Sequence, residues 1–357
     1  MQENSIGIQV KYALAETVRK WLIKHQVINT SLEFIREEEV LTIPVTLAID
    51  DTHSLMSSFS VELEFKIDKF AFEKKVMTPT NLYDAISNEL PTHLLEFIPK
   101  AYDVIGDIIV VDIPKELIGY QGIIGKALLS LFPSINTVYR KASAVSGMLR
   151  IRELEFLAGE EKCETEHHEH GVKIYVDVCN TYFSPRLGNE HNRIAKIIQN
   201  DEIVIDLFTG VGSFPLHIAK HIKSTTYAID LNKTAIQCLE KSIKINKLKG
   251  EIIPLRGDCR DLTTNLPEAD RVIMNLPSKS KEYLDVACQV IKPGGTIYFY
   301  NFVSDDNPEE EILNLLKQNL QEVNWSIRKK ISFQKIRESA PHEIHACLEA
   351  TIEPTST

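Results

Sequence analysis

The stretch Asp206-Leu-Phe-Thr-Gly-Val-Gly-Ser-Phe214 predicts the fold of the C-terminal half of this chain. It follows the apolar pair Val204-Ile205, so a strand breaks here into a glycine-rich turn before a helix. Gly210 and Gly212 let the backbone bend sharply and approach a ligand closely, which a Cβ would hinder. Since ligands of open parallel sheets bind outside the carboxyl ends of the strands, this turn marks a candidate binding site.

A second stretch, Asn275-Leu-Pro-Ser278, places an amide and a proline at the carboxyl end of another predicted strand. The sequence around both stretches alternates between buried-strand and helical patterns. Strands are expected at 204–206, 226–230, 250–255, 272–274 and 296–300, with helices between them. This alternation predicts an α/β fold with a doubly wound, Rossmann-like sheet.

The chain has 357 residues, which is too long for one ordinary domain. We predict three parts: an N-terminal α/β accessory domain over 1–76, a middle α+β domain over 77–180, and the doubly wound domain over 181–357. The first boundary rests on the Pro/Thr break at Met77-Thr-Pro-Thr80. No residue of the first part has a pattern typical of catalysis.

The charge distribution leaves two interpretations open. A net charge of −10 argues against a nucleic-acid partner. However, the segment from Leu117 to Arg152 contains no acidic residue and includes Arg140, Lys141 and Arg150. A basic face on an acidic protein can still follow phosphates, because the local potential governs the encounter. The alternative is that these are ordinary solvated charges.

The cysteines and the polar tract before residue 172 favour a reduced, metal-free protein. The six cysteines show no CxxC pairing, and Cys179, Cys238, Cys288 and Cys347 are expected as small buried hydrophobes, which suits the cytoplasm. The tract with Cys163 and His167, His168 and His170 lacks the paired spacing of a closed zinc site, so we predict a hairpin loop and no metal ligands. The sequence contains no run of 18 apolar residues, so it predicts no membrane span. Its first residues lack the pattern of a signal peptide.

Three aspartates at predicted strand ends are candidates for binding a nucleoside. Asp230 is placed to accept hydrogen bonds from ribose hydroxyls, and Asp258 to accept one from an adenine amine. Asp206 can anchor the glycine turn or meet an ammonium group. The spacing is DxFxGxG rather than GxGxxG, which favours a nucleoside without phosphates. Each aspartate taken alone could instead cap a helix.

The stretch Tyr182-Phe-Ser-Pro-Arg-Leu-Gly-Asn-Glu190 resembles the YFSPRL-x-x-E signature of the archaeal and eukaryotic tRNA (guanine-N1)-methyltransferases, which act at tRNA position 37 and are related to the wybutosine-synthesis transferases. Further matches are the GxxRxR segment at 147–152, the glycine turn, Asn275-Leu-Pro with Glu282-Tyr-Leu behind it, and the segment 337–345. The chain departs from the family pattern at His191, where Arg is usual, and at Ser339, where Tyr is common.

The resemblance implies a class I methyltransferase domain, S-adenosyl-L-methionine as the donor, and tRNA as the partner. Guanine N1 carries a proton, so the reaction needs a base, which the resemblance assigns to Glu190. It also needs a cation for the charge that builds on O6, assigned to Arg150 rather than Arg152. Asn275 and Pro277 would grip the base, Tyr182 would stack on it, and Arg186 would orient Glu190. Because N1 lies on the Watson–Crick edge, the base must be unpaired or extruded.

The complete set of expected contacts follows from the motifs and the resemblance. Donor contacts are expected from Asp206, Phe208, Gly210, Gly212, Asp230, Leu231, Asp258, Cys259 and Asn275. Contacts to the tRNA are expected from Tyr182, Arg186, Pro277, Arg140, Lys141 and Arg152. The enzyme is expected to be a cytoplasmic monomer that needs no protein partner.

Several alternatives remain at this point. Arg150 and Arg152 alternate on a predicted strand and could pair with Glu153 or Glu155, and Glu190 could cap or salt-bridge a helix. A wybutosine-pathway transferase, which moves an aminocarboxypropyl group or methylates a tricyclic base, is the second enzymatic hypothesis; the NLP strand end, rather than NPP, favours the first. A non-catalytic RNA-binding protein is the third, and the three intact aspartates argue against it.

Overall fold

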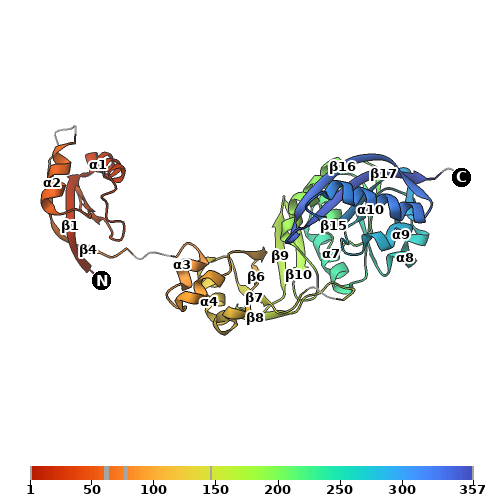
Figure 1. Ribbon diagram of the computed structural model, residues 1–357, viewed down its shortest axis with the longest axis horizontal. Helices are drawn as coiled ribbons and strands as arrows, with labels where there is room; N and C mark the ends of the chain where they lie inside the picture. Colours follow the sequence, from red (N-terminus) through yellow and green to blue (C-terminus); the bar gives the residue numbers. More distant parts are fainter. Residues whose placement is uncertain (1, 60–63, 76–78, 145–146, 356–357) are drawn as a thin grey trace. The chain divides into compact units, whose positions relative to one another are not determined.

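The computed structural model describes residues 2–59, 64–75, 79–144 and 147–355, and it divides into two compact units, Met1–Thr80 and Asn81–Thr357 (Figure 1). The boundary predicted between residues 76 and 77 lies outside the described residues. The division of the second unit at residue 180 stays a prediction. No helix in the described ranges is both long and apolar enough to cross a membrane.

The first unit is an antiparallel sheet covered by helices. Its strand order is β2-β3-β1-β4, with β1 at Gln2–Lys11, β2 at Ile35–Arg36, β3 at Val40–Pro44 and β4 at Phe65–Glu73. Helix α1 (Tyr12–Lys24) buries Ala15, Val18 and Leu22, which recur on one helical face. That face joins a core with Ile8 and Ile43 of the sheet. Helix α2 spans Ile49–Ser57 and adds Met56.

The second unit begins with a four-stranded sheet. Its order is β5-β6-β7-β8, with β5 at Tyr102–Ile105, β6 at Ile108–Val111, β7 at Thr137–Lys141 and β8 at Leu154–Gly159. Strands β6 and β7 are parallel, and α4 (Gln121–Leu131) forms the crossover between them and packs on β7 and β8. The short helix α3 (Leu82–Ile86) and the 3-10 turns η1 (Thr92–Phe97) and η2 (Lys115–Tyr120) complete this layer.

A hairpin connects this sheet to the C-terminal part. Its strands are β9 (Glu164–Glu169) and β10 (Val172–Asp177), with Thr165 opposite Val176. The prediction of a loop over the polar tract is therefore wrong over β9. Thr165 and Glu169 are buried on one face of the strand, while Glu164 and His168 are exposed. Burial therefore alternates along β9 as in any half-buried strand, but the buried residues are polar and give no hydrophobic pattern.

The C-terminal part confirms the predicted doubly wound sheet. Seven strands lie in the order β13-β12-β11-β14-β15-β17-β16, and the first five are parallel. The strand order reverses beside β11, and ligands of such sheets bind at this switch point. The strands are β11 (Ile203–Asp206), β12 (Thr225–Asp230), β13 (Glu251–Arg256), β14 (Ala269–Met274), β15 (Ile291–Ser304), β16 (Trp325–Ala340) and β17 (Glu343–Pro354).

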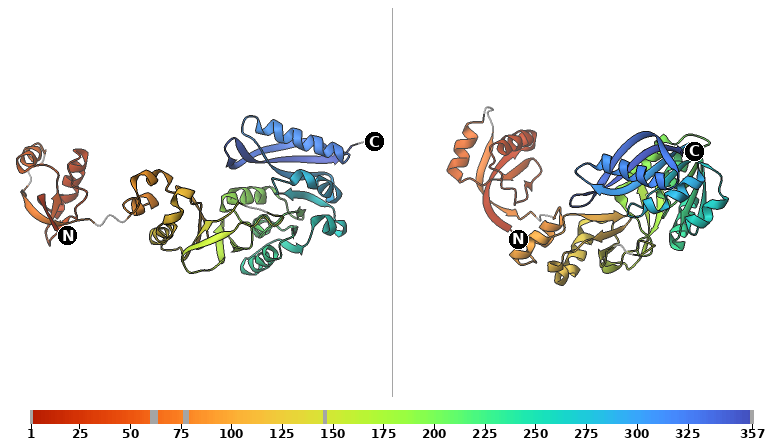
Figure 2. Two further views of the ribbon diagram at one scale, coloured as in Figure 1. Left: turned by 60° about the horizontal axis from the view of Figure 1, so that its bottom comes forward. Right: turned by 45° about the vertical axis from the view of Figure 1, so that its right-hand side comes forward.

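Helices cover both faces of this sheet. Helix α10 runs along β16 and β17 (Figure 2) and buries Ile312, Leu316 and Leu320 against it. The opposite face carries α5, α6 and α7, and the last two also pack on the β9–β10 hairpin. The helices are α5 (Gly188–Ile197), α6 (Ser213–His221), α7 (Lys233–Ile245), α8 (Cys259–Leu262), α9 (Leu284–Val290) and α10 (Pro308–Glu322), with 3-10 turns η3 (Pro185–Leu187), η4 (Thr263–Asn265) and η5 (Ser280–Tyr283).

Two local predictions are corrected by the structure. The strand predicted through Arg150 and Arg152 begins only at Leu154, because Gly147–Arg150 forms a turn that Arg150 ends with a left-handed φ of 54°. Cys179 is not a free thiol, since it forms a disulfide with Cys163 across the ends of the hairpin. The buried, free cysteines are Cys238, Cys259, Cys288 and Cys347.

Candidate active site

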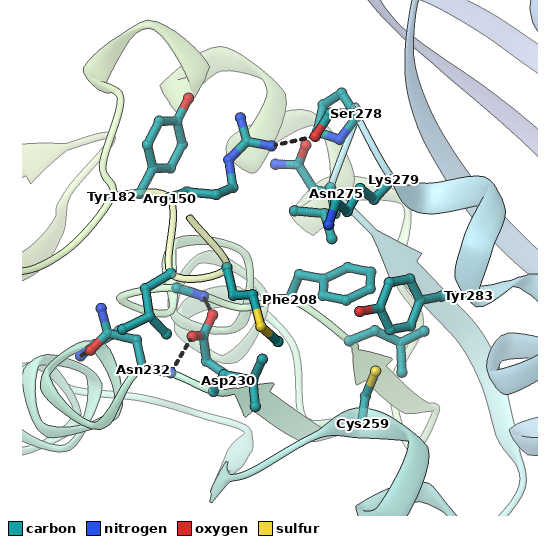
Figure 3. A pocket seen from close by; sticks show the side chains of 18 of the residues that line it. Arg150, Tyr182, Phe208, Asp230, Asn232, Cys259, Asn275, Ser278, Lys279 and Tyr283 are labelled. Carbon is teal, nitrogen blue, oxygen red and sulfur yellow. Dashed lines mark hydrogen bonds between the residues drawn. The ribbon is translucent and has the colours of Figure 1, made fainter. Parts of the chain in front are cut away.

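A pocket opens at the carboxyl ends of the parallel strands, at the predicted switch point (Figure 3). Three sheet-end segments line one part of it: the glycine turn after β11, the residues after β12, and those after β13. The Gly147–Arg150 turn, Tyr182 and the end of β14 line the other part. Of the predicted site residues, those in its lining are Arg150, Tyr182, Phe208, Gly210, Asp230, Leu231, Asp258, Cys259, Asn275 and Pro277.

The glycine turn needs both of its glycines. Gly210 and Gly212 have left-handed φ angles of 56° and 86°. A Cβ at position 212 would collide with the side chain of Leu239 in α7. Glycine is therefore also required at this position for the start of α6 to pack against α7. Gly212 itself does not line the pocket. The N–H of Gly210 donates to Oδ2 of Asp230 at 2.7 Å, which fixes the turn to the end of β12.

Asp230 organises the residues after β12. Its Oδ1 accepts the backbone N–H of Asn232 at 2.8 Å, and burial raises the pKa of its carboxyl group. Asn232 caps α7 by accepting the N–H of Thr234, and its amide donates to the carbonyl of Asn180. Asn232 also lines the pocket, although it was not among the residues predicted from the sequence. Its position directly before a helical pattern was the available signal.

Asp206 lies behind the pocket rather than in its lining. It is fully buried, and its Oδ1 accepts the N–H of Phe208 at 3.3 Å. Burial raises the pKa of Asp206 to about 7. This geometry corresponds to the first of its two predicted tasks, anchoring the turn.

An apolar slot of the pocket, lined by Phe208, Tyr283 and Cys259, adjoins Asp258. Phe208 packs edge-on against Tyr283, with ring centroids 4.9 Å apart, and Cys259 faces the same space (Figure 3). Asp258 caps α8 by accepting the N–H of Arg260 at 2.9 Å, and it lines the pocket. A planar ring with an exocyclic amine would fit between these aromatic rings and this carboxylate.

Arg150 enters the pocket from the opposite side. Its Nη1 donates to Oγ of Ser278 at 3.1 Å, and its guanidinium carbon lies 5.1 Å from the ring centroid of Tyr182 (Figure 3). The left-handed backbone of Arg150 is uncommon for a residue with a side chain, and such conformations cluster at functional sites. Nearby, Oδ1 of Asn275 is buried without a hydrogen-bond partner in the described structure. The pocket therefore places a cation and a free acceptor opposite the donor-side carboxylates.

Comparisons with known proteins give matches over most of the chain. Residues 165–328 match the TRM5/TYW2 methyltransferase domain, and residues 82–162 match the TYW2 N-terminal domain. The tRNA (guanine(37)-N(1))-methyltransferase Trm5b of Pyrococcus abyssi is 36% identical over 304 residues, which cover 85% of this chain and 86% of that protein.

The chain belongs to the TRM5/TYW2 methyltransferase family.

Solved structures extend the similarity over the whole fold. A complex of aTrm5 with tRNALeu superposes with a TM-score of 0.82 at 31% identity, covering 97% of this chain and 99% of that chain. TYW2 of Methanocaldococcus jannaschii, solved with AdoMet, superposes with a TM-score of 0.55 at 27% identity, covering 71% of this chain and 100% of that one. The family resemblance expected from the sequence is therefore confirmed.

The environment of Glu190 differs from the one expected for a catalytic base in the pocket. It is buried in α5 outside the pocket lining, and Arg193 binds its carboxylate through two hydrogen bonds of 2.7 and 2.8 Å. Tyr300 donates to Oε1 of Glu190 at 2.6 Å. The ring of Tyr300 is 5.7 Å from that of His345, which does line the pocket. Glu190 thus lies one layer of side chains behind the pocket.

The predicted tRNA-binding cations are largely paired with acids. Arg140 forms an ion pair with Glu155, and Lys141 lies 3.4 Å from Asp103. Arg186 also binds Asp103, at 2.8 Å, so the prediction that it orients Glu190 is wrong. Arg193, one helical turn after Glu190, takes that place.

A neighbouring cavity adjoins the active-site pocket. Arg152 and Lys141 line it together with Arg150 and Tyr182. Arg152 therefore lies next to the pocket that holds Arg150 but does not line it.

Three further pocket residues were not assigned a role from the sequence. His345 is buried with both ring nitrogens unpaired in the described structure, and burial lowers its pKa to about 3, so the ring is neutral. Arg337 lies beside it in the lining, and Lys279 follows the Asn275-Leu-Pro stretch there. The first two belong to the segment 337–345 that matched the family, which was the only sequence signal for them.

Proposed function

We propose that this protein transfers a methyl group from S-adenosyl-L-methionine to N1 of the guanosine at position 37 of tRNA. The observation that carries the proposal is the convergence of Arg150 and Asn275 with Asp230 and Asp258 on one pocket. The name of the Pyrococcus abyssi relative and the aTrm5–tRNALeu complex support the substrate. We further propose that the protein acts in the cytoplasm as a monomer, and that the N-terminal unit contacts the tRNA body or braces its neighbour.

The donor side of the pocket fits an adenosine-containing methyl donor. Asp230 holds its carboxylate at the pocket wall, where it can accept from ribose hydroxyls while keeping its backbone hydrogen bonds. Asp258 can accept from the adenine amine, with the ring in the slot beside Phe208 and Tyr283. When bound, S-adenosyl-L-methionine supplies an electrophilic methyl group on a positively charged sulfur.

The opposite side fits a guanine whose N1 becomes nucleophilic. Loss of the N1 proton places negative charge on O6, and the guanidinium of Arg150 stabilises that charge. The ring of Tyr182 supplies a stacking face for an extruded base. Oδ1 of Asn275 accepts a hydrogen bond from the Watson–Crick edge and thereby satisfies its unpaired lone pairs.

Glu190 is the proposed acceptor of the N1 proton. Its carboxylate is hydrogen-bonded to Arg193 and Tyr300 behind the pocket, so direct transfer requires it to release one of these partners and to move into the pocket when the base enters. Catalytic hydrogen bonds often form only in the substrate complex. Kinetic comparison of Glu190 and Tyr300 variants separates this role from a structural one.

A wybutosine-pathway transferase is the second candidate, favoured by the match of residues 82–162 to the TYW2 N-terminal domain. Aminocarboxypropyl transfer uses a different carbon of the donor, whereas methylation of a tricyclic base uses the same methyl carbon and differs only in the acceptor base. Unmodified tRNA transcripts, and tRNA that carries a tricyclic base at position 37, should be incubated with donor labelled either in the methyl group or in the aminocarboxypropyl chain, followed by nucleoside mass spectrometry. We expect methyl label in 1-methylguanosine, and none in a control transcript that carries adenosine at tRNA position 37. Transfer of aminocarboxypropyl label, or no transfer to any transcript, would overturn the proposal.

A further inference from the structure

Three buried polar side chains meet outside the pocket, where the β9–β10 hairpin packs on α5 and α6. Glu169 ends β9, His191 lies in the first turn of α5, and His217 lies in α6. Their side chains are 6%, 4% and 0% exposed. The proposed methyl transfer uses none of them, so the group needs an explanation of its own.

The ligand atoms of these residues converge. Oε1 of Glu169 lies 2.8 Å from Nδ1 of His191 and 3.6 Å from Nε2 of His217. All three ligand atoms lie within 4.8 Å of one another. Ligand atoms on a tetrahedral zinc ion, with bonds of about 2.0–2.1 Å, are roughly 3.3 Å apart. The observed separations from Oε1 lie on either side of this value, so small side-chain rotations would place all three on one ion.

Two atoms of the group are unsatisfied. In the described part of the chain, Nε2 of His217 and Oε2 of Glu169 are buried without a hydrogen-bond partner. Nδ1 of His217 lies 2.8 Å from the carbonyl oxygen of Ser213, which can only accept. Nδ1 therefore carries the proton and Nε2 keeps its lone pair, the form in which histidine binds a metal. A bound cation would remove the penalty of burying these unpaired acceptors.

A further histidine, His167, lies beside the carboxylate of Glu169. The N–H of Gly106 donates to Nδ1 of His167 at 3.2 Å. In the neutral ring the proton then resides on Nε2, which lies 3.8 Å from Oε2 of Glu169. This separation is too long for a hydrogen bond, but a small rotation would let His167 act as an outer group that orients a metal-binding carboxylate, as commonly surrounds metal sites.

We propose that Glu169, His191 and His217 bind one Zn²⁺ ion. Two imidazoles and one carboxylate suit zinc, whereas Mg²⁺ and Ca²⁺ prefer oxygen ligands. The ion would join the hairpin to α5, which contains the end of the Tyr182–Glu190 segment, and to α6, which follows the glycine turn. It would therefore stabilise both walls of the active site from behind. The sequence did not predict it, because the polar tract contributes only Glu169 and the two histidines come from distant helices.

The test uses the untagged full chain, stripped with EDTA and titrated with ZnCl₂ against a chromophoric chelator. We expect one equivalent of zinc per chain and a higher melting temperature than in EDTA. His217→Gln and Glu169→Gln should each weaken zinc binding by about 100-fold or more, since even the loss of an outer-shell group costs 10–100-fold. His168→Gln is the matched control, because this histidine lies on the same strand but is 63% exposed.

Two results would overturn the proposal. One is a wild-type protein that binds zinc no better than His217→Gln, which would leave Glu169 and His191 as a buried hydrogen-bonded pair only. The other is an equal loss of affinity in the His168→Gln control. If the buried variants do not fold, as judged by circular dichroism, Co²⁺ titration of the wild type decides: visible absorption bands of a bound tetrahedral ion that zinc abolishes support the site, and their absence refutes it. None of these measurements depends on methyl transfer.

Discussion

The guanidinium of Arg150 lies over the ring of Tyr182, 5.1 Å from its centroid, while the same guanidinium donates to Ser278 after β14. Arg150 comes from the turn before β8, and Tyr182 from the segment between β10 and α5. The contact thus ties three separate segments into one wall of the pocket. An Arg held in this way needs little reorganisation to meet charge that develops on a base.

Arg150→Ala is therefore expected to lower kcat by about 100-fold or more, as loss of a preorganised charge-stabilising donor typically does. Donor affinity, measured by calorimetry, should stay unchanged because the donor side of the pocket is intact. Arg152→Ala is the matched control, since Arg152 lines the neighbouring cavity instead. A larger loss of kcat in Arg152→Ala than in Arg150→Ala would reverse the assignment.

Asp230→Ala should weaken donor binding by about 2 kcal/mol, or roughly 30-fold, the scale of hydrogen bonds to a charged group. The change removes the proposed ribose acceptor and also frees the N–H of Gly210. Calorimetric titration with S-adenosyl-L-methionine and with its demethylated product measures the effect. Asp261→Ala, an exposed change in the first turn of α8, should bind both ligands like the wild type. Equal losses in the two variants would contradict the role of Asp230.

Glu190 is tested by comparing Glu190→Gln with Tyr300→Phe. Both changes remove a hydrogen bond from one buried network, so both are expected to lower the free energy of unfolding by about 1–3 kcal/mol. Only Glu190→Gln removes the proton acceptor, and it alone should lose most of kcat while donor affinity persists. Similar kcat losses in both variants would indicate that Glu190 acts by packing.

The pocket residues at the strand ends could be predicted from the sequence for a topological reason. The carboxyl ends of parallel strands share one edge of the sheet, so Asp230, Asp258 and Asn275 had to lie near the glycine turn once the strands were recognised. The doubly wound order then placed them at one switch point, and the structure agrees.

The partners of Glu190 and Arg186 could not be predicted in this way. Which acid binds which base depends on side-chain packing, and Arg193 competes for Glu190 from one helical turn away while Asp103 binds Arg186 from another sheet. The turn at Arg150 was also missed, because its left-handed backbone stops the strand that the alternating pattern predicted.

The buried carboxyl of Asp206 predicts an unusual pH dependence of stability. Its pKa is about 7 in the folded protein and near 3.8 when exposed. Between these values the folded state holds a proton that the unfolded state has released, so stability falls as pH rises, by about 1.4 kcal/mol per unit for this group. The free energy of unfolding should be measured by denaturant titration of the wild type and of Asp206→Asn, without donor, at pH 5 and at pH 8. We expect Asp206→Asn to be more stable relative to the wild type at pH 8 than at pH 5. A constant difference between the two proteins would show that Asp206 does not titrate in this range.

Basic residues differ in whether they already form an ion pair, and this difference should affect how much each contributes to tRNA binding. Lys279 is exposed at the pocket and has no ion-pair partner among the residues that the structure describes, whereas Arg140 is paired with Glu155. A cation that already neutralises a carboxylate releases fewer counterions when a phosphate approaches. Lys279→Ala should therefore raise KM for tRNA and reduce the slope of log affinity against log salt by about 0.7, the value for one contact to a single strand. Arg140→Ala should change this slope less, and filter binding over a series of salt concentrations measures both. A larger slope change in Arg140→Ala would show that the Glu155 pair opens to bind RNA, and would restore the basic segment predicted from the sequence as the main tRNA contact.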